Sequence, residues 1–171
     1  SRFVARLDSV PPERIRVVAT NALRQAKNAN DFIARANKIL PKPIEIIAGR
    51  EEARLIYLGV SHTNASSDKR LVIDIGGGST EFIIGQEFDP LLTESLQMGC
   101  VAFTQKYFAD GQITKEAFNN AISAARKEVL AIQKKKKKVG WSSVVGSSGT
   151  IKAVRNVLVS KGWADEQERI T

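Results

Sequence analysis

The stretch that best predicts the fold is LVIDIGGGSTE, residues 71–81. An apolar strand, 71–75, runs into three consecutive glycines, and a second strand is expected over 81–85. Glycines carry no side chains, so the backbone N–H groups of such a turn can approach an anion closely. Two hydroxyl side chains follow and add donors. The sequence therefore predicts a phosphate-binding turn made of Gly76, Gly77, Gly78, Ser79 and Thr80.

Two carboxylates bracket this glycine turn. Asp74 lies near the end of the first strand, and Glu81 begins the second. Because Mg²⁺ prefers carboxylate and phosphate oxygens together, we expect Asp74 and Glu81 to hold Mg²⁺, or Mn²⁺, beside a bound phosphate. A hairpin that binds nothing is the alternative, since Gly, Asp and Ser are ordinary turn formers. The turn is not a Walker P-loop, because no Gly-Lys-Ser/Thr follows it.

The flanking segments alternate between strand and helix patterns. Before the turn, strands are expected over 14–20 and 44–48, helices over 22–40 and 51–60, and a polar connection over 61–69. After the second strand we expect a third strand over 91–97, helices over 101–108 and 114–136, a strand over 141–146 and a helix over 149–159. This order predicts an α/β fold and excludes all-helical and all-β proteins.

Composition bounds the class of protein. The chain has 171 residues and a net charge of +8, which favours polyanionic partners. Its longest apolar runs are too short to cross a bilayer and it opens on no secretory leader, so we expect a cytoplasmic protein with no membrane partner. The single cysteine, Cys100, is expected to be a small buried residue. Five lysines, 134–138, are expected to form a solvated end of a helix, and a binding surface for polyanions is the alternative.

Several segments, in the same order, resemble the exopolyphosphatase and guanosine pentaphosphate phosphohydrolase family of the actin, Hsp70 and sugar kinase superfamily. They are Ala19-Thr20-Asn21-Ala22-Leu23-Arg24, Gly49-Arg50-Glu51-Glu52-Ala53-Arg54, the glycine turn, Ser95-Leu96-Gln97-Met98-Gly99-Cys100-Val101 and Gly146-Ser147-Ser148-Gly149-Thr150. The resemblance runs from about residue 15 to residue 171. It implies actin-like ATPase (ribonuclease H-like) lobes, with residues 1–55 in the second half of the first lobe and 56–171 in the first part of the second.

The resemblance also implies roles for two residues outside the turn. Arg24 would contact phosphate, and Glu52 would be the catalytic residue that takes a proton from the attacking water. By themselves, a surface Arg and paired glutamates at a helix start are usually structural. The implied activity is release of terminal phosphate from inorganic polyphosphate, which the basic charge and Gly78 favour, and guanosine pentaphosphate is the rival substrate.

The chain departs from the family pattern at both ends. Family members begin with a first phosphate loop of the Asp-Xaa-Gly-Ser-Asn-Ser type and continue beyond the position of Thr171, so we expect a fragment with weak activity or none. A non-catalytic polyphosphate- or nucleotide-binding sensor is the alternative of another class. Carboxylates disfavour it, because they repel a polyanion unless a metal or proton intervenes. A homodimer is compatible with the sequence, and nucleic acid is disfavoured as a partner.

Overall fold

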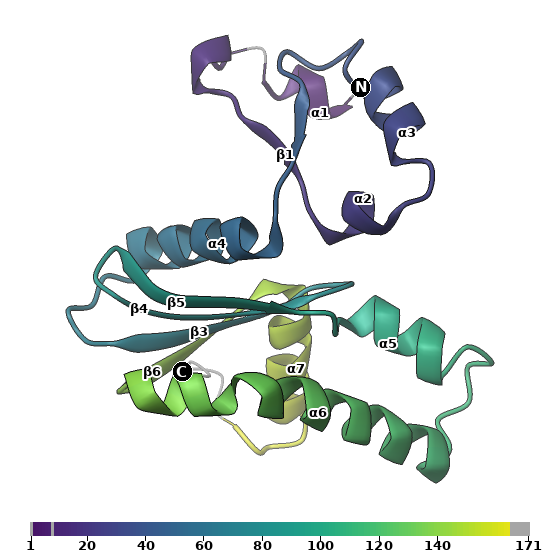
Figure 1. The fold of residues 1–171 in the computed structure, drawn as a ribbon, viewed down its shortest axis with the longest axis vertical. Coiled ribbons are helices and arrows are strands. Elements are labelled where there is room, and N and C mark those ends of the chain that lie inside the picture. Colours follow the sequence, from purple (N-terminus) through teal and green to yellow (C-terminus); the bar gives the residue numbers. More distant parts are fainter. Residues whose placement is uncertain (1, 8, 165–171) are drawn as a thin grey trace. The chain divides into compact units, whose positions relative to one another are not determined.

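The computed structural model describes residues 2–7 and 9–164. The chain divides into two units, residues 1–48 and 49–171, and each unit has a sheet of its own (Figure 1). The lobe boundary expected after residue 55 falls inside helix α4 (Gly49–Thr63), which belongs to the second unit. Among the described residues, no helix combines the length and apolar character needed to span a bilayer.

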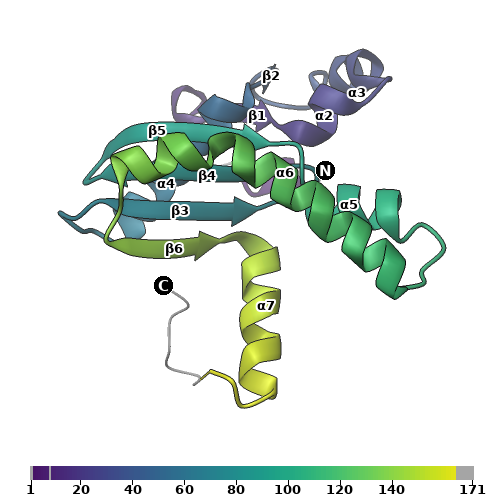
Figure 2. The same ribbon diagram turned by 60° about the horizontal axis from the view of Figure 1, so that its bottom comes forward.

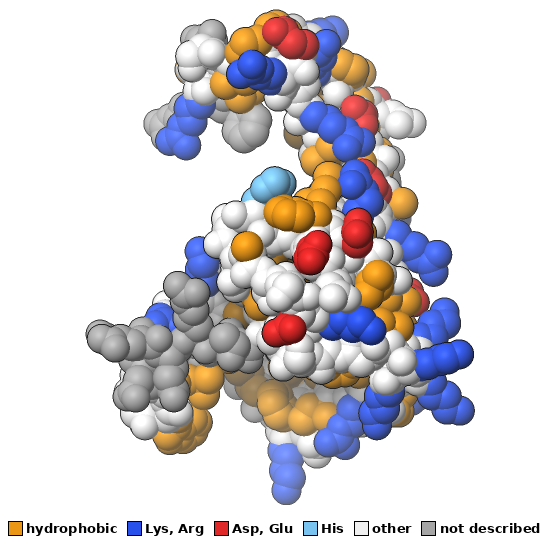
Figure 3. Space-filling model, turned by 90° about the vertical axis from the view of Figure 1, so that its left-hand side faces the viewer, with side chains coloured by type: hydrophobic (Ala, Val, Ile, Leu, Met, Phe, Trp, Pro, Cys, Tyr) orange, Lys and Arg blue, Asp and Glu red, His pale blue; other side chains and the backbone are white. Residues whose placement is uncertain are grey.

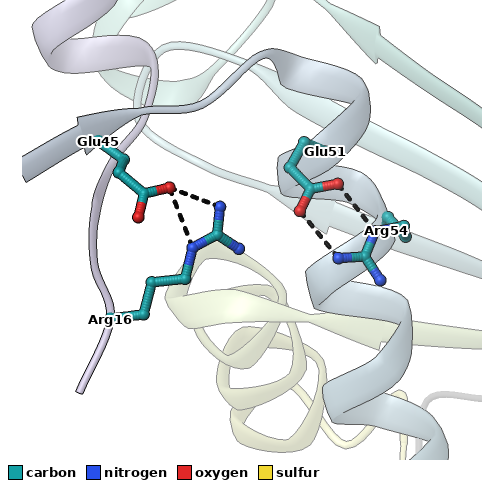
Figure 4. Close-up of polar contacts among 4 residues, drawn as sticks. All are labelled: Arg16, Glu45, Glu51 and Arg54. Carbon is teal, nitrogen blue, oxygen red and sulfur yellow. Dashed lines mark hydrogen bonds and ion pairs between the residues drawn. The ribbon is translucent and has the colours of Figure 1, made fainter. Parts of the chain in front are cut away.

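The first unit is built around a small parallel sheet. Strands β1 (Val17–Ala19) and β2 (Ile44–Ile46) pair in parallel, so both strands predicted for this part of the sequence are confirmed in shorter form. Beside this pair, Arg16 donates from Nε and Nη2 to Glu45 Oε2, at 3.1 and 2.7 Å (Figure 4). The remaining elements of the unit are α1 (Arg2–Ala5), η1 (Pro12–Arg14), α2 (Asn21–Gln25) and α3 (Ala29–Ala36).

The single helix expected over 22–40 is wrong, because two helices occupy that segment. Ala26 has extended backbone angles, φ −70° and ψ 126°, and ends α2. Asn28 then precedes α3. The Asn28 side chain makes no capping hydrogen bond, so the break is the change of backbone angles at Ala26, which the continuous apolar spacing does not reveal.

The second unit contains a four-stranded sheet in the order β5-β4-β3-β6. The strands are β3 (Arg70–Ile75), β4 (Thr80–Gln86), β5 (Asp89–Leu96) and β6 (Ser143–Ser147). The first three pair antiparallel, and β6 pairs parallel with β3 (Figure 2). Four helices complete the unit, α4, α5 (Cys100–Tyr107), α6 (Lys115–Val139) and α7 (Ser148–Ser160). All the strands and helices predicted for this unit are confirmed, with shifted ends.

Both faces of this sheet are covered, because successive strand residues point to opposite sides. On one side, Val72 and Ile83 pack against Ala53 and Tyr57 of α4, and we call this side the α4 face. On the other side a second apolar cluster packs against Ile132 of α6; it comprises Leu71, Phe82, Ile84 and Leu96. Figure 1 shows the two helices on opposite sides of the strands.

Two predictions about polar segments need correction. Helix α4 runs to Thr63, so Ser61 and His62 belong to the helix and not to the connection expected over 61–69. In the lysine run, Lys136 is buried instead of solvated, and its Nζ lies 4.8 Å from the centre of the Phe82 ring. Burial lowers the pKa of Lys136 to about 8, with the charge of Glu94 opposing the shift. The long aliphatic stem of lysine fits an apolar interior, which residue type alone does not reveal.

Candidate functional site

The glycine turn is held in place by the start of α5. Gly76 N–H donates to Ser79 O at 2.9 Å and closes the turn, while the N–H groups of Cys100 and Ala102 donate to Gly76 O and Gly77 O, at 3.0 and 2.9 Å. Gly99 lies against this backbone so closely that a Cβ there would stand 2.5 Å from Gly77 O. The turn is therefore fixed by backbone contacts that only a glycine at position 99 permits.

Three backbone donors of the turn remain available for a ligand. Across the described residues, no backbone hydrogen bond outside the helices and strands uses the N–H groups of Gly77, Gly78 or Ser79. Consecutive N–H groups in a turn form a concave site for an anion. Other backbone groups therefore do not take these three donors, and phosphate binding by them stays a prediction.

The two hydroxyl groups of the turn have partners inside the protein. Thr80 Oγ1 donates to Met98 O, and its side chain lies on the face of the sheet opposite the α4 face. Ser79 is 3% exposed and makes a hydrogen bond with the Glu81 side chain. Sequence reasoning counted both hydroxyls as ligand donors, whereas here they hold the turn and a neighbouring carboxylate.

The two predicted metal ligands lie on the same face of the sheet. Asp74 and Glu81 are directly opposite each other on β3 and β4, and both point to the α4 face. Glu81 is 1% exposed, and Ser95 Oγ donates to its Oε1 at 2.8 Å. Ser95 stands opposite Glu81 on β5, a partnership that the sequence signalled only through strand alternation.

The pKa of Glu81 is affected by burial, by hydrogen bonds and by charged neighbours. Burial raises its pKa above the usual range, hydrogen bonds from Ser95 and Ser79 oppose the shift, and the charges of Glu52 and Asp74 raise it further. The charge of Glu52, in the first turn of α4, therefore reaches Glu81, which lies directly opposite Asp74 on the sheet.

The two glutamates at the start of α4 have different surroundings. Glu51 accepts both Nε and Nη2 of Arg54, each at 2.8 Å, one turn along the helix (Figure 4). This carboxylate is thereby committed to a structural ion pair. Glu52 is half-buried and acts electrostatically on Glu81. Of the two glutamates, Glu52 is the one whose charge raises the pKa of Glu81.

Arg24 belongs to the first unit. Its Nη1 donates to Ile47 O at 2.6 Å, which ties α2 to the end of β2. The residue lies in the last turn of the five-residue helix α2. Its predicted contact with phosphate stays a prediction.

The donor set fits a magnesium ion that shares its ligands with phosphate. Within the described range, no group of three or more His, Cys, Asp and Glu side chains is arranged to hold a metal. Mg²⁺ needs fewer, because it commonly binds one or two carboxylates together with substrate phosphates. Asp74 and Glu81 supply two carboxylates beside the turn, and burial, followed by the charges of Glu52 and Asp74, raises the pKa of Glu81.

A cavity of about 440 Å³ lies on the opposite face of the sheet, behind the turn. Its walls are mostly apolar and include Phe82, Met98, Phe103 and Thr150. Cys100 also lines it and is exposed, so the prediction of a buried cysteine is wrong. The residue begins α5, where the chain leaves the sheet for the surface.

Comparison with known proteins identifies relatives over nearly the whole chain. The model of the Ppx/GppA phosphatase family matches residues 1–171. A guanosine-5'-triphosphate,3'-diphosphate pyrophosphatase of Photobacterium profundum is 46% identical over 162 residues, which make up 95% of this chain and 33% of that protein. A protein of the same name from Vibrio cholerae is 47% identical over 162 residues. The chain therefore spans about a third of the length of these relatives.

Solved structures show the same fold. The Aquifex aeolicus PPX-GPPA enzyme is 30% identical with a TM-score of 0.72, and the match covers 93% of this chain and 52% of that one. An exopolyphosphatase-like protein is 26% identical with a TM-score of 0.85, covering 93% and 51%. The predicted α/β fold of the actin-like ATPase class is thereby confirmed, as part of a larger protein.

Proposed function

Because the chain belongs to the Ppx/GppA phosphatase family, we propose that it carries the phosphate turn and the catalytic carboxylates of a phosphoanhydride hydrolase. The proposed reaction is release of the terminal phosphate from inorganic polyphosphate by water. One observation supports it above the others. The N–H groups of Gly77, Gly78 and Ser79, which make no backbone hydrogen bond, follow Asp74 closely in the chain. Asp74 lies opposite Glu81 on the sheet, and the charge of Glu52 on α4 acts on Glu81.

In this proposal the backbone binds the group that is transferred. The three N–H groups of the turn donate to oxygens of the terminal phosphoryl group, whose charge is redistributed in the transition state. Donors that are already oriented lower the barrier because they need no rearrangement during the reaction. Arg24, the other predicted phosphate ligand, would donate from its guanidinium to the same phosphoryl group.

Glu52 is the proposed general base. It takes a proton from water while the water oxygen bonds to phosphorus and the terminal anhydride P–O bond breaks, which leaves orthophosphate and a shortened chain. Ser95 and Ser79 hold Glu81 in position by their hydrogen bonds. Mg²⁺ or Mn²⁺, bound by Asp74 and Glu81 with phosphate oxygens, would supply charge neutralisation.

Guanosine pentaphosphate is the second candidate substrate. The relatives at 46% and 47% identity are named for it, which favours it directly. The net charge of +8 favours the longer polyanion. Both substrates end in the same phosphoanhydride, so the proposed roles do not change. A cytoplasmic location and a homodimer belong to the proposal too, and fractionation with light scattering tests them.

The experiment compares Glu52→Gln with Glu51→Gln. Both changes remove one negative charge from the first turn of α4, but only Glu52 has the proposed role. We expect Glu52→Gln to lower kcat for phosphate release about 10²- to 10⁴-fold with little change in substrate affinity, and Glu51→Gln to retain activity within a few-fold. Both substrates are assayed with and without Mg²⁺, in the 171-residue chain and in a longer form that contains the first phosphate loop.

Three outcomes would count against the proposal. Equal turnover of the two variants would remove Glu52 from the mechanism. Substrate binding without hydrolysis by any form would favour the non-catalytic sensor. Equal turnover by the 171-residue chain and the longer form would contradict the expectation that this chain alone is weakly active.

A further inference from the structure

The start of α7 lies beside the glycine turn. Strands β3 and β6 pair in parallel up to Asp74 and Ser147, so the next residues along the chain, Ile75 and Ser148, follow this last pair. Ser148 is the first residue of α7, and its Oγ donates to Ile75 O at 2.8 Å. The hydroxyl therefore adds one hydrogen bond at the end of the β3–β6 pairing, immediately before Gly76.

Ser148 keeps a backbone conformation that serine rarely adopts. Its φ angle is 79°, in the left-handed region, where a residue with a Cβ is disfavoured. The chain also turns tightly from β6 into α7, since a Cβ at Gly146 would stand 2.5 Å from Ile151 Cγ2. Such a conformation persists where surrounding contacts hold it, and the hydrogen bond to Ile75 O is one of these contacts.

Three consecutive carbonyl groups at the turn accept hydrogen bonds from outside it. Ser148 Oγ donates to Ile75 O, and two N–H groups at the start of α5 donate to Gly76 O and Gly77 O. The start of α7 thus holds the first carbonyl, and the start of α5 holds the next two. Two helices that follow the turn at different distances along the chain together fix the backbone on which the proposed phosphate site depends.

Fixing a carbonyl group also fixes the N–H group of the next residue. The two groups belong to one planar unit and point in opposite directions when the peptide bond is trans, as it is in this turn. The bonds from α5 therefore direct the N–H groups of Gly77 and Gly78 away from that helix. The bond to Ile75 O directs Gly76 N–H toward Ser79 O, with which it closes the turn.

We propose that Ser148 is a positioning residue for the glycine turn. Its hydroxyl orients the peptide unit of Ile75 and Gly76, and this unit closes the turn whose remaining N–H groups bind phosphate in the proposed function. Ser148 itself touches no phosphate in this role. Only the last step, binding of phosphate by the turn, rests on the proposed function, and the orientation of the peptide unit does not.

Two substitutions separate the hydroxyl from the unusual φ angle. Ser148→Ala removes the hydroxyl and keeps a Cβ at positive φ, whereas Ser148→Gly removes the hydroxyl and relieves the φ angle. Ser148→Gly should therefore be the more stable variant in urea unfolding, while both variants share the same defect at the turn. Ser160→Ala is the control, because Ser160 Oγ donates to Val157 O, at 2.9 Å, at the other end of α7.

Amide hydrogen exchange of the ligand-free protein, followed by ¹⁵N NMR, tests the orientation directly. We expect the Gly76 amide to exchange about tenfold faster in both Ser148 variants, the loss of roughly one hydrogen bond, and at the wild-type rate in Ser160→Ala. Each rate is compared with that of Ile83, which is fully buried in β4 and reports opening of the whole sheet. An unchanged Gly76 rate in both Ser148 variants would overturn the proposal.

The opposite end of the sheet provides an internal reference in the same spectra. Figure 3 looks onto this end, where His62 of α4 is drawn in pale blue, and the centre of its ring lies 5.0 Å from that of Phe88. The amides of His62 and Phe88 should exchange at wild-type rates in the Ser148 variants. Acceleration there equal to that at Gly76 would mean that the substitutions loosen the whole unit, which contradicts a local role.

Titration with inorganic phosphate at constant ionic strength tests the consequence for binding. The amides of Gly77, Gly78 and Ser79 should shift along one curve in the wild type, and both Ser148 variants should need about three to ten times more phosphate. Wild-type affinity in both variants would also overturn the proposal. If phosphate shifts none of these amides in the wild type, the proposed function fails instead, and the exchange rate of Gly76 still decides whether Ser148 orients the turn.

Discussion

The two ends of the α4 face carry opposite charges on one continuous surface. At the glycine-turn end, Asp74 and Glu81 lie near the first turn of the helix. At the far end, Arg70 lies against the helix C-terminus. Between them the contact is apolar, made by Val72, Ile83 and the helix residues above them. The helix dipole favours negative charge at its start and positive charge at its end, so each end has the sign that the helix stabilises.

The ends differ in how well their buried charges are satisfied. Glu81 receives hydrogen bonds from Ser95 and Ser79, whereas Arg70 has one bond to a carbonyl and an unoccupied edge. A buried charge without hydrogen bonds costs more free energy than one that has them, because its lost hydration is not replaced.

The largest expected effect tests the packing at the far end. Gly85→Ala should destabilise the protein by about 3 kcal/mol, because the new Cβ would stand 2.2 Å from a ring carbon of the fully buried Tyr57. Urea unfolding measures the change in the free energy of unfolding. Gly59→Ala is the matched control, because an added Cβ at this position inside α4 would meet nothing within 4 Å. This variant should be more stable than the wild type by about 0.5 to 1 kcal/mol. If the Gly85→Ala variant is as stable as the wild type, the Tyr57 ring does not pack closely against Gly85.

A smaller loss is expected at the glycine-turn end. Gly99→Ala should cost about 2 kcal/mol and also weaken phosphate binding by the turn, since the Cβ would push on the backbone of Gly77 and Gly78. Gly149→Ala is the control, because nothing lies within 4 Å of that position. Titration of the ¹⁵N-labelled protein with inorganic phosphate, followed by NMR, should show weaker binding at the glycine-turn amides in Gly99→Ala and unchanged binding in Gly149→Ala. Equal binding by the two variants would mean that Gly99 does not hold the turn.

Lys136 is a buried cation on the opposite face, and it offers a contrast with Arg70. Its folded pKa of about 8 lies below the unfolded value of about 10.4, so between these pH values the unfolded state binds more protons. The free energy of unfolding should therefore rise with pH across this window, by roughly 2 kcal/mol once solvent near the ammonium is allowed for. Lys136→Met should remove the rise.

The control for this change is Lys134→Met, which replaces an exposed lysine on the same helix. That variant should keep the rise with pH. A flat pH profile in the wild type would show that the Lys136 ammonium is hydrated.

The smallest effect concerns the carboxylates. Without metal at neutral pH, Glu81→Gln should stabilise by about 1 kcal/mol, because it removes a buried charge that faces two other carboxylates. Mg²⁺ should raise the melting temperature of the wild type and not that of Glu81→Gln. Glu94→Gln, on the other face of the sheet, should keep the response to Mg²⁺ although it loses its ion pairs with Arg50 and Lys135. A rise in the melting temperature of Glu81→Gln with Mg²⁺ would mean that the metal binds without Glu81.

Local pattern was enough to predict the elements of the second unit. The apolar run before three glycines predicted β3, the turn and β4, and the periodicity after Thr114 predicted α6, whose first turn Thr114 caps by accepting Ala117 N–H. The break between α2 and α3 was missed, because the change of backbone angles at Ala26 does not show in apolar spacing.

The candidate site was predicted in its residues but not in their partners. Strand alternation places Asp74 and Glu81 on one face, yet the hydrogen bonds of Ser79 and Ser95 to Glu81 depend on which strand lies beside β4. In the same way, the commitment of Thr80 to Met98 O depends on how the chain returns after β5. Residue type indicates which group can bind a ligand, but not which neighbour has already taken it.

The glycine turn could be predicted from neighbouring residues alone, because three consecutive residues without side chains leave the backbone N–H groups of a turn uncovered. The burial of Arg70 and Lys136 followed from tertiary structure, since both occur in sequence beside exposed lysines of the same charge. Burial is set by the elements that pack above a residue, and those come from distant parts of the chain. For that reason the buried positions of Arg70 and Lys136 have no signature in the sequence, whereas the glycine turn has one.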